Sequence, residues 1–135
     1  MITRASADEV IDLRWRVLHP GRARRDAHMA SDHAPSTRHW ALRRHGVVVA
    51  VVSVLELRGL ALRGMAVEPS LQRLGLGARL LDHVQREVDA AMWCNARSSA
   101  VAFYSACGWT PVGPAFEIDG EGPHQRMVWA PGNAS

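Results

Sequence analysis

The stretch from Gln72 to Ala78 constrains this chain most, because it joins a strand pattern to a helix pattern through closely spaced glycines. The preceding residues 60–67 are mostly apolar and are followed by Glu68 and Pro69, as expected at the end of a strand. Small or apolar residues then recur at helical spacing: Gly77, Leu81, Val84 and Val88. A helix that begins at a glycine turn presents unpaired backbone N–H groups at the positive end of its dipole. The sequence therefore predicts an anion site here, suited to a phosphate or pyrophosphate.

Two common phosphate-binding patterns do not fit this turn. A P-loop needs a lysine after its last glycine, and the chain contains no lysine. The dinucleotide fingerprint needs a third glycine where Leu80 stands, and an acidic residue after the next strand, where Asn95 stands. The remaining pattern is Gln/Arg-x-x-Gly-x-Gly/Ala, which Gln72 to Gly77 match in full. A glycine turn that merely starts a helix stays open as the alternative.

A second motif lies downstream, between Ala100 and Trp109. It places Phe103 and Tyr104 on a short helix that ends at Gly108, with Ser98 or Ser99 as the expected N-cap. The two motifs, separated by one helix and one strand, resemble those of the GNAT superfamily of N-acetyltransferases. The family's short helix reads Ala-x-x-Phe/Leu-Tyr-x-x-x-Gly-Phe, and only the last position differs here. The resemblance covers residues 40–130.

The resemblance implies a small bacterial GNAT domain of the α/β class. We expect a mixed, mostly antiparallel central sheet of about six to seven strands flanked by about four helices. A single domain over residues 1–130 and a flexible tail over residues 131–135 are expected. Local patterns agree, because Ser6 and Glu9 form a capping box for a first helix. Residues 47–54 are nearly all β-branched and predict a central strand buried on both faces.

The resemblance also implies that acetyl-CoA is the co-substrate, bound along the 60–67 strand and at the glycine turn. The strand would bind pantetheine through its main chain, with the Val67 N–H as oxyanion donor and a bulge permitted by Gly64. Asn95 is expected to contact pantetheine, although Arg97 occupies the position where many family members carry asparagine. The expected cofactor contacts are Met65, Ala66, Val67, Gln72, Arg73, Leu74, Gly75, Leu76, Gly77, Ala78, Arg79, Asn95 and Phe103.

Tyr104 matches the family's general acid, which protonates the departing thiolate. No motif identifies the base that deprotonates the amine. His124 and Glu117 are the preferred candidates, ahead of Glu56 and Glu68. A base role for water, or an amine that arrives unprotonated, stays open beside them.

The segment over residues 19–39 is expected to shape the acceptor pocket. Its Asp32 and His39 are candidates for acceptor selection, and Arg22 to Arg25 would favour a carboxylate or phosphate on the acceptor. No metal site is expected there, since the histidines lack the spacing of a zinc motif.

These observations predict an enzyme that moves the acetyl group of acetyl-CoA directly to a primary amine of a small molecule or peptide. The alternatives are a non-catalytic acyl-CoA-binding module and an arginine-rich protein that associates with nucleic acid. The net charge is +3, but the arginines are scattered and form no basic stripe with aromatics, which argues against nucleic acid.

The composition also bears on location and assembly. No apolar run approaches the ~20 residues of a membrane span, and no signal peptide is recognisable. Cys94 and Cys107 lack a CxxC spacing and predict reduced, buried thiols in a cytoplasmic protein. A homodimer through the C-terminal strands is compatible with this organisation, although no motif indicates it.

Overall fold

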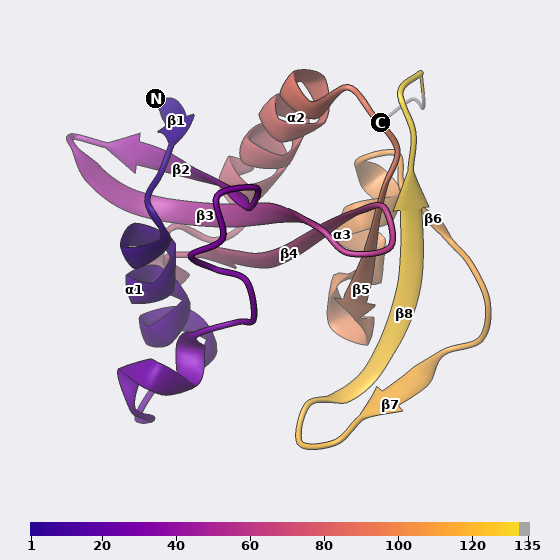
Figure 1. Ribbon diagram of the computed structural model, residues 1–135, viewed down its shortest axis with the longest axis horizontal. Coiled ribbons are helices and arrows are strands. Elements are labelled where there is room, and N and C mark those ends of the chain that lie inside the picture. The colour runs from indigo at the N-terminus through magenta and orange to yellow at the C-terminus, as the bar shows by residue number, and fades with distance from the viewer. Residues whose placement is uncertain (133–135) are drawn as a thin grey trace.

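The computed structural model describes residues 1–132 as one mixed sheet with helices on both of its faces (Figure 1). Part of the predicted tail, residues 133–135, lies outside the described residues. The strands are β1 (Ile2–Arg4), β2 (Arg38–Arg44), β3 (Val47–Glu56), β4 (Leu60–Val67), β5 (Met92–Arg97), β6 (Thr110–Pro111), β7 (Phe116–Ile118) and β8 (Gly122–Trp129). The α-helices are α1 (Ala7–Leu18), α2 (Leu76–Val88) and α3 (Val101–Ala106). Short 3-10 turns cover Arg24–Ala27, Pro69–Leu71 and Ser98–Ala100.

The strand order is β1-β2-β3-β4-β5-β8-β6, with β7 paired to β8, and every pairing is antiparallel except β4 with β5. This mixed, mostly antiparallel sheet confirms the predicted fold class. The parallel pair meets only at Leu60 with Met92 and at Ala61 with Trp93. Within residues 1–132, β4 therefore has no strand neighbour on its β5 side beyond Ala61, and no strand pairs with its main-chain groups there.

β4 carries a bulge, as the resemblance to the GNAT superfamily implied. Val51 of β3 pairs with Ala66, but Ser53 pairs with Arg63, so two residues of β4 lie opposite one residue of β3. The extra pair is Gly64 and Met65, and Gly64 has a positive φ of 69°. Such a bulge kinks the strand and re-aims its backbone groups, which directs the second half of β4 away from β5.

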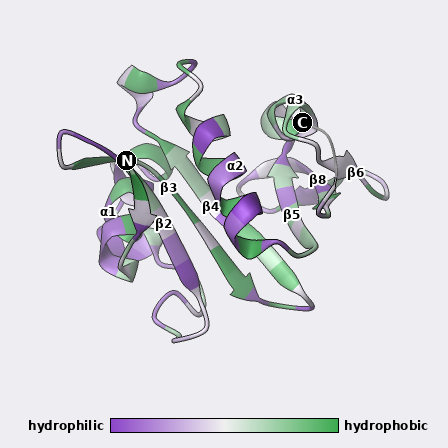
Figure 2. Cartoon of the chain, turned by 90° about the horizontal axis from the view of Figure 1, so that it is seen from above, coloured by the Kyte–Doolittle hydropathy of each residue, from purple (hydrophilic) through white to green (hydrophobic). Residues whose placement is uncertain are grey.

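Two apolar layers cover the sheet. On one face, α1 packs Val10 and Leu13 against small and branched residues of β2, β3 and β4. On the other face, α2 and α3 cover the larger core, in which Trp40 and Leu80 are fully buried. Figure 2 shows the resulting colouring: hydrophobic residues run along the central strands, whereas α2 carries hydrophilic residues on its outer side. The capping box of α1 is present as predicted, since the Glu9 N–H donates to Ser6 Oγ and the Ser6 N–H donates to Glu9 Oε1.

Three expectations about element ends are wrong. Neither Ser98 nor Ser99 caps α3; both lie in a 3-10 turn, and the N-cap is Ala100 without a side-chain hydrogen bond. β5 continues to Arg97 instead of ending at Asn95, and β8 begins at Gly122, inside the segment 119–123, whose two glycines and Pro123 predict a turn. Pairing with a neighbouring strand extends both elements: β5 pairs with β8 up to Arg97 with His124, and the start of β8 pairs with β7 up to Gly122 with Ile118. Cross-strand pairing sets these ends, and local turn residues do not.

Across residues 1–132, none of the helices combines the length and the apolar character needed to cross a bilayer.

Candidate functional site

A cavity of about 690 Å³ opens where β4 passes into α2. The N-cap of α2 is Gly75, which has no side chain to cap the helix, so the first N–H groups of α2 stay available for a ligand. The predicted cofactor residues that line this cavity are Met65, Ala66, Val67, Gln72, Arg73, Gly75, Leu76, Gly77, Ala78 and Phe103. The structure thus gathers most of the predicted cofactor contacts around one hollow at a helix N-terminus, a geometry suited to a pyrophosphate.

The main chain of Val67 is aimed at this cavity. Ala66 pairs with Val51, and the Glu68 N–H donates to the Val49 carbonyl at 2.8 Å. Since successive residues of an antiparallel strand direct their backbone groups to opposite sides, the N–H and C=O of Val67 point away from β3. The Gln72 side-chain amide donates to the Val67 carbonyl at 3.0 Å, which fixes the turn, and the Val67 N–H faces the same side of β4.

Gly77 allows α3 to approach the start of α2. A Cβ built on Gly77 would lie 3.4 Å from Cζ of Phe103 and 3.5 Å from Cγ2 of Val67. Any larger side chain would push the Phe103 ring away from the helix N-terminus. Phe103 can therefore form one wall of the cavity directly beside the amides of α2.

A second cavity of about 360 Å³ continues from the first, between the diverging ends of β4 and β5. The two cavities share the lining residues Leu18, Met65, Ser99, Ala100 and Phe103, so they form one groove. Tyr104, Asn95 and His124 line the second part. The groove therefore leads from the helix N-terminus to the predicted acid and one of the predicted bases.

Tyr104 reaches this groove from the side of α3. Its ring is 7% exposed and makes edge contacts with Trp109 and Phe103, at centroid distances of 5.5 and 5.2 Å. Burial raises the pKa of Tyr104 well above its usual range, and the neighbouring thiols of Cys94 and Cys107 add to the effect. The phenol is therefore protonated at neutral pH, as a proton donor must be.

The two cysteines are buried free thiols, as predicted. Burial raises the pKa of Cys94 to about 12 and also raises the pKa of Cys107. Because a thiol attacks as the thiolate, neither residue is suited to act as a nucleophile.

His124 reaches the groove from the opposite face of the sheet. It pairs with Arg97, and the two side chains lie on the same face of the sheet. Cys94 and Met127 also pair, but their side chains lie on the other face, where they pack in one core with Tyr104. Nδ1 of His124 lies 2.9 Å from the Gly122 carbonyl oxygen. Since a carbonyl only accepts, Nδ1 carries the proton and Nε2 of the neutral ring is the acceptor nitrogen. The residue is 3% exposed, and its ring packs near Phe116.

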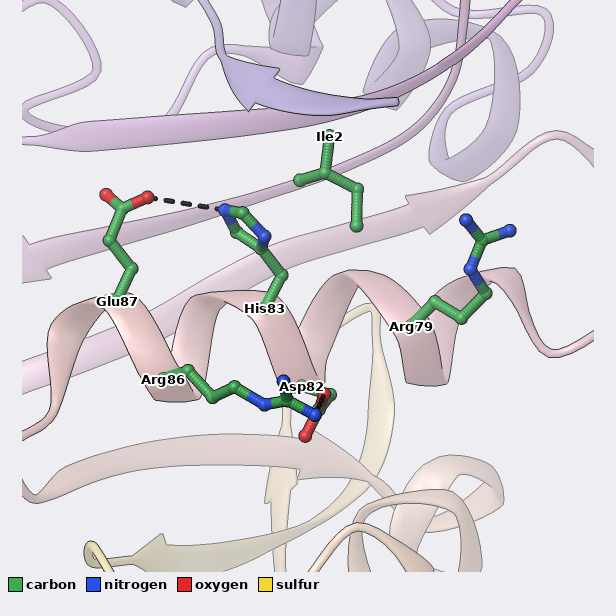
Figure 3. A pocket seen from close by; sticks show the side chains of 6 residues that line it. All are labelled: Ile2, Arg79, Asp82, His83, Arg86 and Glu87. Atoms are coloured by element: carbon green, nitrogen blue, oxygen red, sulfur yellow. Dashed lines mark hydrogen bonds and ion pairs between the residues drawn. The ribbon is translucent and has the colours of Figure 1, made fainter.

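Several predicted residues lie elsewhere. Glu117 is exposed and pairs with Pro123, which places its side chain on the face opposite His124 and outside the lining of the groove in the described part of the chain. Arg79 lines a different surface hollow together with His83 (Figure 3). Leu74 is 61% exposed and does not line the cavity.

Asn95 lines the second part of the groove, beyond the cavity at the helix N-terminus. Its Oδ1 accepts a hydrogen bond of 2.7 Å from Nε of Arg126.

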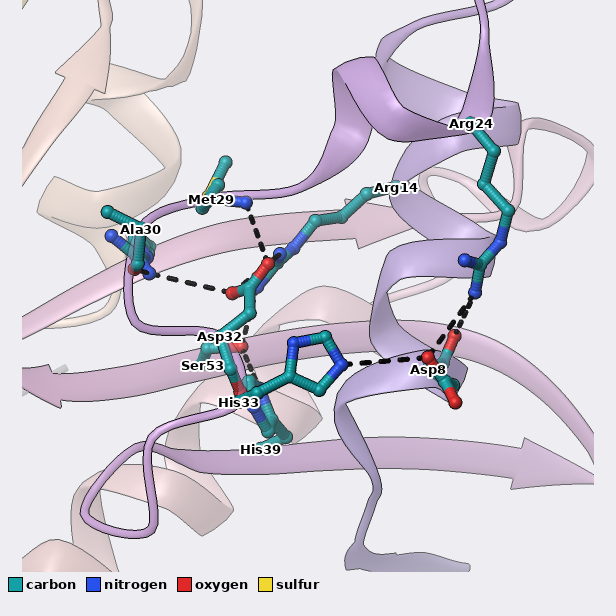
Figure 4. A network of polar contacts seen from close by, with 10 residues as sticks. Asp8, Arg14, Arg24, Met29, Ala30, Asp32, His33, His39 and Ser53 are labelled. Carbon is teal, nitrogen blue, oxygen red and sulfur yellow. Dashed lines mark hydrogen bonds and ion pairs between the residues drawn. The ribbon is translucent and has the colours of Figure 1, made fainter.

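The expectation that Asp32 and His39 select the acceptor is wrong, because both are buried in a polar network under the bulge of β4 (Figure 4). Nη1 of the fully buried Arg14 donates to both carboxylate oxygens of Asp32, at 3.0 and 2.9 Å, and Nη2 donates to Ser53 Oγ at 2.8 Å. His39 links Ser53 to the Asp32 carbonyl, at 2.6 and 2.8 Å. The network ties the 28–37 loop to the sheet.

The arginines predicted to attract an acidic acceptor also lie elsewhere. Arg24 forms ion pairs with Asp12 and Asp8 of α1, and Arg22 pairs with Asp26. Over residues 1–132, no group of three or more potential ligand side chains is placed to hold a metal ion.

Sequence reasoning missed four residues at the site. Trp93, Arg63 and Glu121 line the second cavity, and Arg14 supports the bulge. The alternation of Trp93, Asn95 and Arg97 along β5 is a period-two signal that places Trp93 on the same face as Asn95. Arg63 and Arg14 meet the site only through tertiary packing, and no local signal identifies them.

Comparisons with known proteins agree with this geometry. The family model of the acetyltransferase (GNAT) domain matches residues 15–130. The chain is 27% identical over 134 residues to an uncharacterized N-acetyltransferase, YitI, of Bacillus subtilis (strain 168), and the match covers 90% of each chain.

Solved structures share the fold. The ribosomal-protein-S18-alanine N-acetyltransferase from Escherichia coli superposes with a TM-score of 0.76 at 22% identity, over 100% of this chain and 97% of that one. An aminoglycoside 6'-N-acetyltransferase complexed with coenzyme A gives a TM-score of 0.74 at 16% identity, over 95% of each chain. At these identities, the structural likeness establishes the fold alone.

Proposed function

The chain belongs to the GNAT family of acetyltransferases, and we propose that the groove described above is its active site. The enzyme transfers the acetyl group of acetyl-CoA to an amine. The observation that carries the proposal is the order of groups along one groove. Helix N-terminal amides lie at one end, the Val67 N–H lies between, and Tyr104 and His124 approach the other end from opposite faces of the sheet.

The first N–H groups of α2 and the turn before it hold the pyrophosphate of acetyl-CoA in this proposal. The absence of a capping side chain at Gly75 supports it, because an anion can then satisfy amides that would otherwise lack a partner. Met65 and Val67 pair with the pantetheine arm along the free side of β4. The missing β5 partner beyond Ala61 supports this role, since unpaired strand groups bind an extended ligand readily.

Val67 also stabilises the charge that develops on the thioester oxygen. Its N–H is directed into the groove, and the hydrogen bond from Gln72 to its carbonyl holds the peptide in place before substrate arrives. A preorganised backbone donor of this kind contributes most where water is excluded.

Tyr104 protonates the departing thiolate in this proposal. A phenol is protonated at neutral pH, and Tyr104 approaches the groove from the side of α3, which also walls the cavity at the helix N-terminus. The acid therefore lies on the cofactor side of the sheet.

His124 removes the proton of the amine in this proposal. Nε2 is the unprotonated nitrogen of the neutral ring, because Nδ1 is bonded to the Gly122 carbonyl. The base therefore works on the face opposite Tyr104, so the acceptor enters from the side of β5 and β8 that α3 does not cover. No covalent enzyme intermediate is involved, because both cysteines are protonated and buried.

An amine panel tests the proposed site. Purified protein is incubated with acetyl-CoA and individual amines, and both the released thiol and the acetylated amine are measured. We expect equal amounts of the two products and no thiol release in the absence of an amine. Binding of acetyl-CoA without product from any amine would instead identify a non-catalytic acyl-CoA-binding module. Substituting Gly77 by Val, next to Phe103 and Val67, is expected to weaken coenzyme A binding measured by calorimetry.

The proposal includes the cellular setting in which this enzyme works. The two free cysteines agree with a reducing cytoplasm, where acetyl-CoA is also available. The acceptor is a small-molecule or peptide amine, and a homodimer through the C-terminal strands stays a prediction that size-exclusion chromatography with light scattering can check.

A further inference from the structure

The acceptor side of the groove carries a group of arginines. On the sheet face that includes His124, Arg97 lies directly opposite His124, and Arg126 pairs with Asn95. Arg63 of β4 lies on this face too, since it is two residues beyond Ala61, which pairs with Trp93. Arg63 and Arg97 line the second cavity, and Arg126 is bonded to a residue that lines it.

The contacts of these arginines orient them and neutralise them only in part. Arg126 donates from Nε to Asn95 and stacks over the Trp93 ring at 4.1 Å from its centroid. These contacts fix the guanidinium and occupy only its Nε and one of its faces. Arg97 has an acidic neighbour, Glu121, but the separation of 4.0 Å is too long for a hydrogen bond.

Arg63 is also incompletely paired. Its Nη2 donates to the Ala30 carbonyl, while within the described residues its buried Nε has no hydrogen-bond partner. Burial lowers the pKa of Arg63, which reflects the cost of holding this charge away from water. A nearby anion would offset that cost.

The acidic groups nearby do not balance this charge. Nη2 of Arg63 also donates to Oδ1 of Asp32 at 3.5 Å, but that carboxylate already accepts two bonds from Arg14 and a third from the Met29 N–H at 2.7 Å. Glu121 is the acidic residue in the lining of the second cavity. Arg63 and Arg97 line the same cavity, and Arg126 lies beside it, so positive charges outnumber negative ones. A cleft with a surplus of one sign raises the local concentration of oppositely charged ligands.

From this surplus we propose that the acceptor amine carries a carboxylate, which Arg97 and Arg126 bind while the amine contacts Nε2 of His124. Arg97 is the cross-strand partner of His124, and Arg126 is two residues further along β8, about 7 Å away by strand geometry. The acceptor therefore has a short spacer between its amine and its charge. Its spacer packs on the apolar lining, to which Leu57, Trp93 and Ile118 contribute. This proposal rests on the proposed function of the same groove.

Matched acceptors that differ only in charge test the preference. One set consists of ω-amino acids of increasing chain length, each compared with its carboxamide. A second set consists of short peptides with glutamate or glutamine after the N-terminal residue, which separates a peptide carboxylate from that of a small molecule. We expect kcat/KM to be at least tenfold higher for the acid than for its neutral partner in one of the sets. The preference should fall as ionic strength rises, because these arginines are partly exposed.

Variants then identify which residues produce the preference for a charged acceptor. R97Q and R126Q should each reduce the ratio of acid to amide towards one, while KM for acetyl-CoA stays unchanged. R97K should retain part of the ratio, since it keeps the charge but loses the bidentate geometry. R44Q is the matched control, because Arg44 is exposed at the end of β2 and does not line either cavity of the groove within the described residues.

A binding measurement keeps the test independent of turnover. The N-acetylated acids and their amides are titrated into the protein saturated with coenzyme A, and binding is followed by NMR or calorimetry. Binding of one acid that is at least tenfold tighter than binding of its amide, and is lost in R97Q, supports the proposal. Equal binding, no binding, or an R97Q effect on coenzyme A alone overturns it. If the protein binds the acids but acetylates no amine, the proposed function fails and the charge preference survives.

Discussion

A Cβ placed on Gly64 would lie 2.5 Å from Nε of Arg14. Arg14 cannot retreat easily, because it is fully buried and its guanidinium is bonded to Asp32 and Ser53. The bulge of β4, which opens the groove between β4 and β5, therefore rests on the side chain of a buried arginine from α1.

Gly64→Ala is the direct test of this contact. The substitution imposes a positive φ on a residue with a side chain and forces an overlap with a guanidinium that the network holds. We expect a loss of about 2–4 kcal/mol in the free energy of unfolding, measured in urea. Gly46→Ala is the matched control: its φ is 78°, but a Cβ there meets nothing within 4 Å, so a loss of only about 1 kcal/mol is expected. Equal losses at the two glycines would contradict the role of Arg14.

His39 gives the polar network a dependence on pH. Burial lowers the pKa of His39, and the ring is hydrogen-bonded as a neutral imidazole between Ser53 and the Asp32 carbonyl. Below the ordinary pKa of 6.5, the unfolded chain takes up a proton that the folded chain resists. The stability that neutral His39 contributes is therefore present in full above pH 6.5, and it is lost as the pH falls towards the lowered pKa of His39 in the folded protein.

The measurement for His39 is the free energy of unfolding between pH 7.5 and pH 5. The slope with pH should be smaller in His39→Gln than in the wild type, by up to about 1.4 kcal/mol per pH unit. His33→Gln, at an exposed histidine of the same loop, should keep the wild-type slope. A slope that His39→Gln leaves unchanged would show that His39 does not resist protonation in the folded protein.

The sequence predicted those parts of the fold that depend on local signals. The strand, glycine turn and helix around Gln72 to Ala78 and the capping box at Ser6 are recognisable because specific residue types satisfy specific backbone needs. The bulge at Gly64 was expected only from the family resemblance. The end of β5 and the start of β8 were not predicted, since they depend on cross-strand pairing, with β8 about thirty positions away for β5 and with β7 for the first residues of β8.

The same contrast between local signals and tertiary packing holds for the candidate site. The groups that meet the cofactor come from continuous motifs, and the sequence identified them as candidates. The acceptor side is assembled from β4, β5, β8 and the loop after α1, so its arginines could not be distinguished from the other arginines by composition. The sequence assigned acceptor selection to Asp32 and His39, yet tertiary packing buries both under the bulge.

Tyr104→Phe tests the proposed proton donor. The variant keeps the ring contacts with Trp109 and Phe103 but removes the hydroxyl. We expect kcat to fall by about 100-fold or more, which is the usual contribution of general acid catalysis. Coenzyme A should bind with unchanged affinity in calorimetry, because the proposed pyrophosphate and pantetheine contacts come from the main chain of β4 and α2. A variant with unchanged kcat would remove Tyr104 from the mechanism.

The two base candidates are distinguished by a pair of variants, His124→Ala and Glu117→Gln. His124 lines the groove, and Nε2 is the acceptor nitrogen of its neutral ring because Nδ1 donates to the Gly122 carbonyl, whereas Glu117 lies on the other face of β7. We therefore expect kcat/KM for the amine to fall by about 100-fold in His124→Ala. Glu117→Gln should keep wild-type activity. Added imidazole should restore part of the activity of His124→Ala, because the cavity left by the ring admits a small base. Full activity in His124→Ala would instead assign proton removal to water.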